Sequence, residues 1–243
     1  MSVKQRLVEG LRVLTVAGIP TGVLVAGVGS RLAMLLLRVT SDDSVNGLES
    51  DDGFTIGEVT LSGTYNLLML GATVGVIGAG AYRMVRPWLI GPNWLRRVTV
   101  ALGAGAVVGS MLIHADGIDF RALTPTWLAI GLFVALPATF ALAVAVAVDR
   151  VEDPHSWTRR PRIRWLLPLV CIVLFPFSLL ALVFSAAVLA TLTAVDAWRD
   201  ERSPERARAH PAVVLVVRAA WLGIAVLGVL ALVNDVRQIA AVT

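Results

Sequence analysis

Two arginines lie inside apolar stretches of the chain, where their chemistry indicates a ligand site. Arg31 and Arg218 are each surrounded by hydrophobic residues. A guanidinium within a membrane is costly unless it is paired, and it usually faces the interior of a helix bundle or a wet cavity. Because guanidinium groups hold phosphate and carboxylate groups through paired hydrogen bonds, the two arginines could bind an anionic or amphiphilic ligand.

The positions of the two arginines predict that they share one layer of the membrane. Arg38 ends the apolar stretch that contains Arg31, and about 10 Å of helix separates the two residues. Pro211 begins the last stretch, and about the same length of helix separates it from Arg218. If both of these ends face outward, the two guanidiniums lie at similar depth in the outer leaflet.

A short polar segment at the end of the third apolar stretch could complete this site. It contains a histidine that could transfer a proton and carboxylates that could pair with the arginines. The candidate ligand-binding residues are Arg31, His114, Asp116, Asp119 and Arg218. We favour a structural role for the two arginines, as salt bridges that lock the bundle or as side chains extended toward water, since such residues give the same sequence pattern.

Rare residue types exclude several kinds of chemistry. Lys4 is the only lysine and lies outside the apolar stretches, which excludes a Schiff base within the membrane and a phosphate-loop lysine. Cys171 is the only cysteine, which excludes an intramolecular disulfide, a CxxC redox pair and a thiolate zinc site. The sequence predicts neither a cofactor nor a bound metal, and whether the protein is an enzyme stays open.

One polar segment imitates the beginning of a calcium-binding loop. Asp42, Ser44, Asn46 and Gly47 have the spacing of the first ligands and the sharp turn of such a loop. The twelfth position holds Gly53 instead of the glutamate that would bind through both oxygens. We therefore interpret the segment as a solvated, turn-rich loop.

Six long apolar stretches must position these side chains. The chain of 243 residues is 57% hydrophobic and 16% charged, with its hydrophobic residues in blocks between short charged loops, as in membrane proteins. About 20 apolar residues cross the hydrocarbon core as a helix. We predict an all-α transmembrane helical bundle with six spans, at about residues 12–37, 65–85, 97–115, 127–148, 165–193 and 212–233.

The distribution of basic residues predicts the orientation of the bundle. Most of the 21 basic residues fall on segments that are cytoplasmic if the N-terminus is inside, as the positive-inside rule requires. Six spans then give an N-in, C-in topology. Its loops are an external acidic loop over 38–64, a basic cytoplasmic loop over 149–164, and a charged loop over 194–210 that could form an amphipathic helix.

The fifth stretch leaves a second topology open. It is long for one span and contains Pro168 and Pro176. A single kinked span is the plainer interpretation, because prolines are tolerated within a span where neighbours satisfy the freed carbonyls. The alternative is a re-entrant hairpin over 165–193. It would leave 194–210 inside, invert the last span and move Arg218 to the cytoplasmic leaflet.

Glycines spaced four residues apart occur in each of the first three stretches. Such GxxxG pairs let helix backbones approach closely. The sequence therefore predicts that the first three spans pack tightly together, through the pairs Gly18 and Gly22, Gly71 and Gly75, and Gly105 and Gly109.

Four short segments between residues 25 and 140 carry a resemblance. They are Gly29–Met34, Ser50–Phe54, Val85–Leu89, and His114 with the pairs 116–117 and 119–120. Together they resemble segments of a group of uncharacterised actinobacterial polytopic integral membrane proteins. The resemblance implies a high-GC, Gram-positive source, which the predominance of arginine over lysine also indicates. It implies no activity and no catalytic residue.

These features predict a multi-pass protein of the bacterial cytoplasmic (inner) membrane. We expect an accessory or structural bundle protein whose partners are membrane lipids and a second membrane protein, with no role in nucleic-acid binding. One alternative is an intramembrane enzyme or carrier that binds an anionic, lipid-like ligand in the outer leaflet. Another is a small-solute transporter, although no acidic residue at mid-membrane depth is available for proton coupling.

Overall fold

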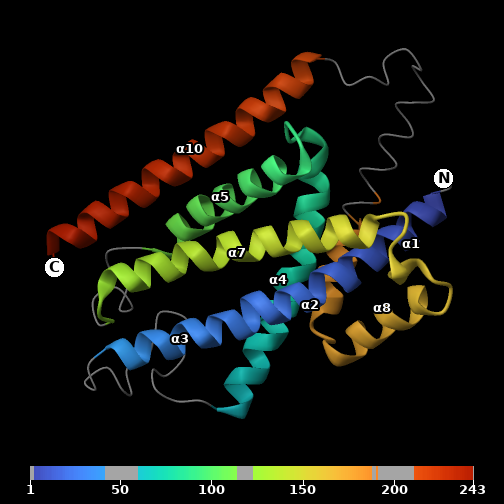
Figure 1. Cartoon of the computed structure of the whole chain (residues 1–243), viewed down its shortest axis with the longest axis horizontal. Helices are drawn as coiled ribbons and strands as arrows, with labels where there is room; N and C mark the ends of the chain where they lie inside the picture. The colour runs from blue at the N-terminus through green and yellow to red at the C-terminus, as the bar shows by residue number, and fades with distance from the viewer. Residues whose placement is uncertain (1–2, 42–59, 114–122, 188–189, 191–210, 243) are drawn as a thin grey trace.

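The chain folds as a bundle of helices. A computed structural model describes residues 3–41, 60–113, 123–187, 190 and 211–242, and no strand occurs among them (Figure 1). Within these residues, five helices are long and apolar enough to cross a membrane: Val8–Thr40, Leu61–Trp88, Asn93–Leu112, Thr126–Glu152 and Arg218–Ala241. The prediction of an all-α bundle is confirmed. The acidic loop with its calcium-like pattern and the charged loop 194–210 lie outside the described residues, apart from the ends of the acidic loop.

The first span is one continuous rod with two π-helical sections. A proline within a helix removes a backbone N–H and crowds the carbonyl four residues earlier, so the hydrogen-bonding pattern must change around Pro20. The rod consists of α1 (Val3–Val13), the π-helix η1 (Leu14–Gly18), α2 (Ile19–Thr21), the π-helix η2 (Gly22–Val28) and α3 (Gly29–Thr40).

The next three long helices run up and down beside this rod. They are α4 (Leu61–Val85), which continues into the short 3₁₀ helix η4 (Arg86–Trp88), α5 (Asn93–Leu112) and α7 (Thr126–Glu152). The Thr60 hydroxyl caps α4 by accepting from the Gly63 amide at 3.1 Å. Gly91 makes the turn between η4 and α5 with a φ of +91°, which residues with a Cβ rarely adopt.

The predicted fifth span is two short helices that form a hairpin. The helix α8 (Ile163–Leu174) follows the 3₁₀ helix η5 (Trp157–Arg159), and a second apolar helix covers Ser178–Ala187. The helix α8 ends at Leu174, and Phe175, just before Pro176, is not helical. Ser185 in the second arm lies against Gly80, near the end of α4. The described part of this stretch is therefore two short helices joined at a turn, and not one continuous helix.

The last helix, α10 (Pro211–Val242), runs parallel to α5. Near its beginning, the Arg218 Nε donates to the carbonyl of Trp88 at 3.1 Å. Near its end, Ile239 packs with Leu37 and Ile113, at the opposite end of the bundle. The two ends of the chain thus lie at opposite ends of the molecule (Figure 1). With five membrane-length helices among the described residues, the predicted six spans and N-in, C-in topology are not confirmed.

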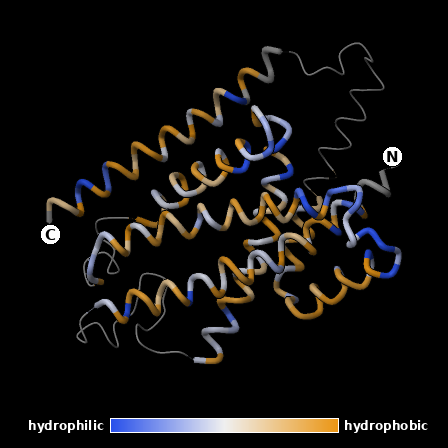
Figure 2. The backbone as a smooth tube through the Cα atoms, viewed as in Figure 1, coloured by the Kyte–Doolittle hydropathy of each residue, from blue (hydrophilic) through white to orange (hydrophobic). Residues whose placement is uncertain are grey.

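We call the end at which α1 begins and α4 and α7 end the arginine-rich end. Arg86 and Arg97 there form ion pairs with Glu152 and Asp149. Figure 2 shows polar residues gathered in the loop before α8, while hydrophobic residues cover most of α10 between hydrophilic turns near its two ends. Large hydrophobic side chains are exposed along α8 and along α10 from Leu215 to Val233, as expected of surfaces that face lipid. This is the pattern of a multi-pass membrane protein.

The closest helix crossing is made by four glycines. Gly18 and Gly22 of the first span face Gly75 and Gly71 of α4, backbone against backbone. The predicted close packing of the first two spans is therefore present. The third pair behaves differently, because Gly105 and Gly109 lie against Val134 of α7. The third span consequently packs on the fourth, and the glycine spacing alone did not indicate that partner.

Candidate ligand-binding site

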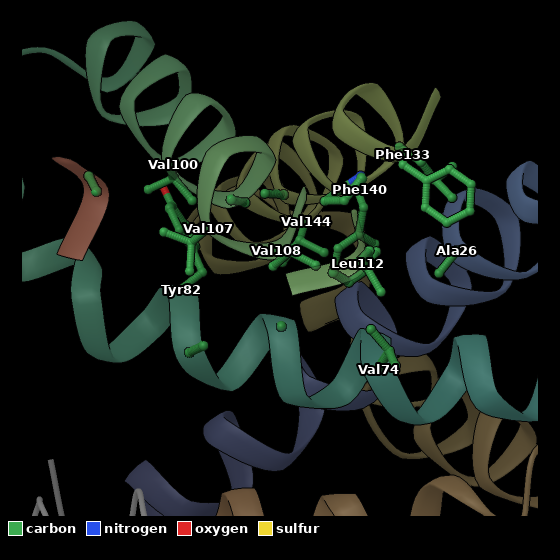
Figure 3. A pocket seen from close by; sticks show the side chains of 18 of the residues that line it. Ala26, Val74, Tyr82, Val100, Val107, Val108, Leu112, Phe133, Phe140 and Val144 are labelled. Carbon is green, nitrogen blue, oxygen red and sulfur yellow. The ribbon is translucent and has the colours of Figure 1, made fainter. Parts of the chain in front are cut away.

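A large pocket lies among α3, α4, α5, α7 and α10. Its volume is about 890 Å³. Figure 3 shows side chains from α4, α5, α7 and the first span that point into this space, among them Val74, Val107, Leu112, Phe133 and Phe140. Small residues at other lining positions keep it open. At Gly103, an added Cβ would meet no atom within 4 Å. The volume falls within the range of about 300–1,000 Å³ that is typical of small-molecule sites.

The charged residues that line the pocket are all arginines. Arg31 and Arg38 come from one face of α3, since seven residues are almost two helical turns, and Arg218 comes from α10. No aspartate or glutamate is found among the described lining residues. The pocket therefore combines an apolar interior with positive charge, which suits a molecule that has a hydrocarbon part and an anionic group.

The structure places Arg31 and Arg218 at opposite ends of this pocket. Gly27, one turn before Arg31, lies against Leu68 near the beginning of α4. Arg218 instead binds Trp88, which follows the end of α4. These two contacts lie 20 residues apart along α4 and η4. The two arginines therefore lie on different levels of the bundle, whereas the prediction of one shared depth assumed a full fifth span.

Arg218 is held in the pocket by a backbone carbonyl and not by a described carboxylate. Its Nε–H donates to the Trp88 carbonyl at 3.1 Å, and no described carboxylate forms an ion pair with it. A guanidinium carries five N–H donors, so most of its hydrogen-bonding capacity is unused by the described residues. Arg31 and Arg38 have interaction partners of their own. Arg218 is therefore the group best able to hold an anion in the pocket.

The other predicted site residues are not placed. His114, Asp116 and Asp119 lie outside the described residues, so their grouping with Arg31 remains a prediction. Among the described residues, no cluster of three or more histidine, cysteine, aspartate or glutamate side chains could hold a metal ion.

A polar network at the arginine-rich end was not predicted. Asp149 near the end of α7 accepts hydrogen bonds from the Tyr82 hydroxyl at 3.2 Å and from Arg97 at 2.9 Å. Glu152, three residues later, pairs with Arg83 and Arg86. The sequence did contain a signal, since acids three residues apart end one apolar stretch and arginines three residues apart end another. Side chains with this spacing share a helix face.

A second buried network joins α1 to the loop after α7. Arg12 is 1% exposed and donates to Glu9, to the Thr158 hydroxyl and to the carbonyl of Val151, at 2.8 Å for the carbonyl. Arg159 binds the same Glu9 carboxylate at 2.7 Å. This network connects elements far apart in the sequence, so it fixes the start of the first span against the end of α7.

Comparison with known proteins adds no relative to these findings. No protein-family model matches the chain, and neither a curated protein nor a solved structure is detectably similar to it.

Proposed function

We propose that this protein binds an amphiphile with an anionic group in the pocket between α3, α4, α5, α7 and α10. The hydrocarbon part lies among the apolar side chains, and the anionic group binds Arg218. The observation that carries the proposal is the lining of the pocket, which is apolar apart from a few polar groups and whose charges are arginines without a described acid. This proposal keeps the lipid-like ligand of the sequence-based alternative. It differs in that the anionic group lies at the arginine-rich end and not in the outer leaflet.

Arg218 contributes more to ligand selectivity than the apolar lining does. In water, burying each methylene group contributes about 0.8 kcal/mol. A ligand that comes from the bilayer gains little from this term, because lipid tails are as apolar as the pocket. Paired hydrogen bonds from the guanidinium to a carboxylate or phosphate therefore supply most of the selectivity.

The arginine-rich end also supports a proposal for the orientation of the protein in the membrane. We propose that the arginine-rich end faces the cytoplasm of a bacterial cell and that α10 ends outside, giving five spans and one re-entrant hairpin. The positive-inside rule supports this orientation. Actinobacterial origin rests on the sequence resemblance alone.

An accessory or structural role is the second candidate. It is favoured by the hydrogen bond between Arg218 and Trp88, which attaches α10 to the end of α4. In that case Arg218 holds two helices together and needs no ligand. Neither the enzyme nor the transporter alternative gains a specific observation from the described residues.

Fluorescence quenching tests the proposal, because Trp88 and Trp221 line the pocket. The purified chain in detergent micelles is titrated with a dibrominated long-chain fatty acid and, separately, with the methyl ester of that acid. We expect saturable quenching by the acid, which Trp221→Phe weakens. Arg218→Gln should lower the affinity for the acid about tenfold, the equivalent of one charge-assisted hydrogen bond, and leave the ester unchanged.

Arg237→Gln is the matched control. Arg237 is an exposed arginine of the same helix at its other end, so its removal changes the net charge equally without touching the pocket. If Arg218→Gln and Arg237→Gln bind the fatty acid alike, the proposed binding role of Arg218 is wrong. A loss of thermal stability in Arg218→Gln with unchanged affinity would assign the residue to the structural role.

A further inference from the structure

A second, smaller hollow lies at the arginine-rich end, outside the apolar pocket. It has a volume of about 290 Å³ and is lined by Arg83, Arg86, Pro87, Arg96 and Glu152. These residues come from the end of α4, from η4, from the beginning of α5 and from the end of α7. The end of α4 and the beginning of α5, which follow one another in the chain, thus meet the charged end of α7.

The ion pairs within this hollow leave an excess of positive charge. Glu152 accepts from Arg83 at 2.8 Å and from Arg86 at 2.5 Å, so one carboxylate serves two guanidiniums. The nearby Asp149 is likewise shared, by Arg86 at 3.3 Å and Arg97 at 2.9 Å. The hollow is lined by three guanidiniums, those of Arg83, Arg86 and Arg96, and by a single carboxylate. The hollow is therefore complementary to an anion.

Arg96 is the residue in this hollow that lacks an acceptor. Its Nε atom is covered from solvent and forms no hydrogen bond with the described residues, and no ion pair of its guanidinium occurs there. Covered donors in folded proteins nearly always have a partner, whether from protein, water or a bound ion. An acceptor brought by a ligand would satisfy Arg96 without rearranging the ion pairs around Glu152.

The position of the hollow corresponds to the boundary between membrane and water. It lies where two membrane-length helices, Leu61–Trp88 and Asn93–Leu112, meet. Trp94 at the start of the second is 65% exposed, as expected for an aromatic residue in the headgroup layer. Basic hollows between spans at this level are suited to lipid phosphates.

We propose that Arg83, Arg86 and Arg96 bind the phosphate of an anionic phospholipid from the leaflet at the arginine-rich end. Arg96 and Arg86 donate paired hydrogen bonds to the phosphate oxygens, while Glu152 holds Arg83 and Arg86 in position. This site takes a bilayer lipid at the rim of the bundle. It does not depend on an amphiphile entering the apolar pocket.

Native mass spectrometry of the full chain tests this site. Protein released from micelles is titrated with phosphatidylglycerol, with phosphatidylcholine and with inorganic phosphate. We expect retention of phosphatidylglycerol over phosphatidylcholine, and an affinity for phosphatidylglycerol about tenfold lower in Arg96→Gln. Arg150→Gln is the matched control, because Arg150 is an exposed arginine at the same end that does not line the hollow. It should retain the lipid like the unchanged chain.

Two outcomes would overturn the proposal. Equal losses in Arg96→Gln and Arg150→Gln would mean that general positive charge, and not this hollow, attracts the lipid. Inorganic phosphate binding that depends on Arg96 and outcompetes the lipid would assign the hollow to a soluble phosphate. Thermal unfolding of each variant is measured in parallel, and Arg96→Lys should recover part of the affinity if charge is what the site supplies. Arg218→Gln should leave lipid retention unchanged, which separates this site from the apolar pocket.

Discussion

A single buried arginine, Arg12, joins the first helix to the end of α7 and the loop that follows it through hydrogen bonds. Arg12 is almost fully buried, and its guanidinium reaches a carboxylate, a hydroxyl and a carbonyl from three different parts of the chain. Burying a charge is expensive, so such a residue is tolerated only where its donors are satisfied. Glu9 is in turn held by a second guanidinium, from Arg159.

We expect Arg12→Met to lower the free energy of unfolding by about 3 kcal/mol, because Thr158 and the Val151 carbonyl lose a buried donor and Glu9 loses one of its two guanidiniums. Denaturation of the purified protein in mixed micelles measures this change. Replacing Glu9 by Gln in the same chain should recover part of the loss, since the remaining carboxylate charge is then removed. The exposed Arg160 provides the control. A loss no larger in Arg12→Met than in Arg160→Met would contradict the role given to Arg12.

At the scale of elements, the contact between the first span and α4 depends on the absence of side chains. A methyl carbon on Gly22 would lie 2.7 Å from the Cα of Gly75 and 2.8 Å from its amide nitrogen. Backbone atoms cannot rotate away, so the two helices would have to separate. We expect Gly22→Ala to lower the free energy of unfolding by about 2 kcal/mol, within the range for overpacked sites.

Gly131→Ala separates this steric effect from helix propensity. At Gly131, in α7, an added Cβ would meet no atom within 4 Å. Alanine is favoured over glycine in a helix by about 1 kcal/mol, so this variant should be as stable as the unchanged chain or more so. Denaturation of both variants under one set of conditions decides the matter. Similar stabilities for the two would show that the crossing is looser than described.

The helices themselves were largely predictable from the sequence, whereas their directions were not. Long apolar stretches predicted α4, α5, α7 and the first span, because hydrocarbon thickness sets the length of a span. Hydropathy cannot distinguish a kinked span from a hairpin of the same composition, and the break at Phe175 depends on local backbone geometry. The direction of α10, and with it the level of Arg218 in the bundle, depends on this one element.

For the molecule as a whole, the proposed topology of five spans and one re-entrant hairpin has an odd number of crossings. We expect the two ends of the described chain to lie on opposite sides of the membrane. Cys171 is the single native cysteine, so Cys171→Ala gives a background without thiols. In that background, Ala241→Cys should react with a membrane-impermeant maleimide in intact cells. Arg160→Cys should react only after the membrane is made permeable. Protection of both positions in intact cells would restore the six-span topology.

The weak burial of α10 has a consequence for how the protein is made. Every member of the main core cluster, from Val13 to Leu182, precedes α10 in the chain, and α10 contributes no residue to it. Membrane helices insert first and associate afterwards. The growing chain can therefore complete its core while α10 is still being synthesised. The pocket lacks one wall until this last helix docks beside α5, so we expect the proposed ligand to enter before docking, without any helix having to open.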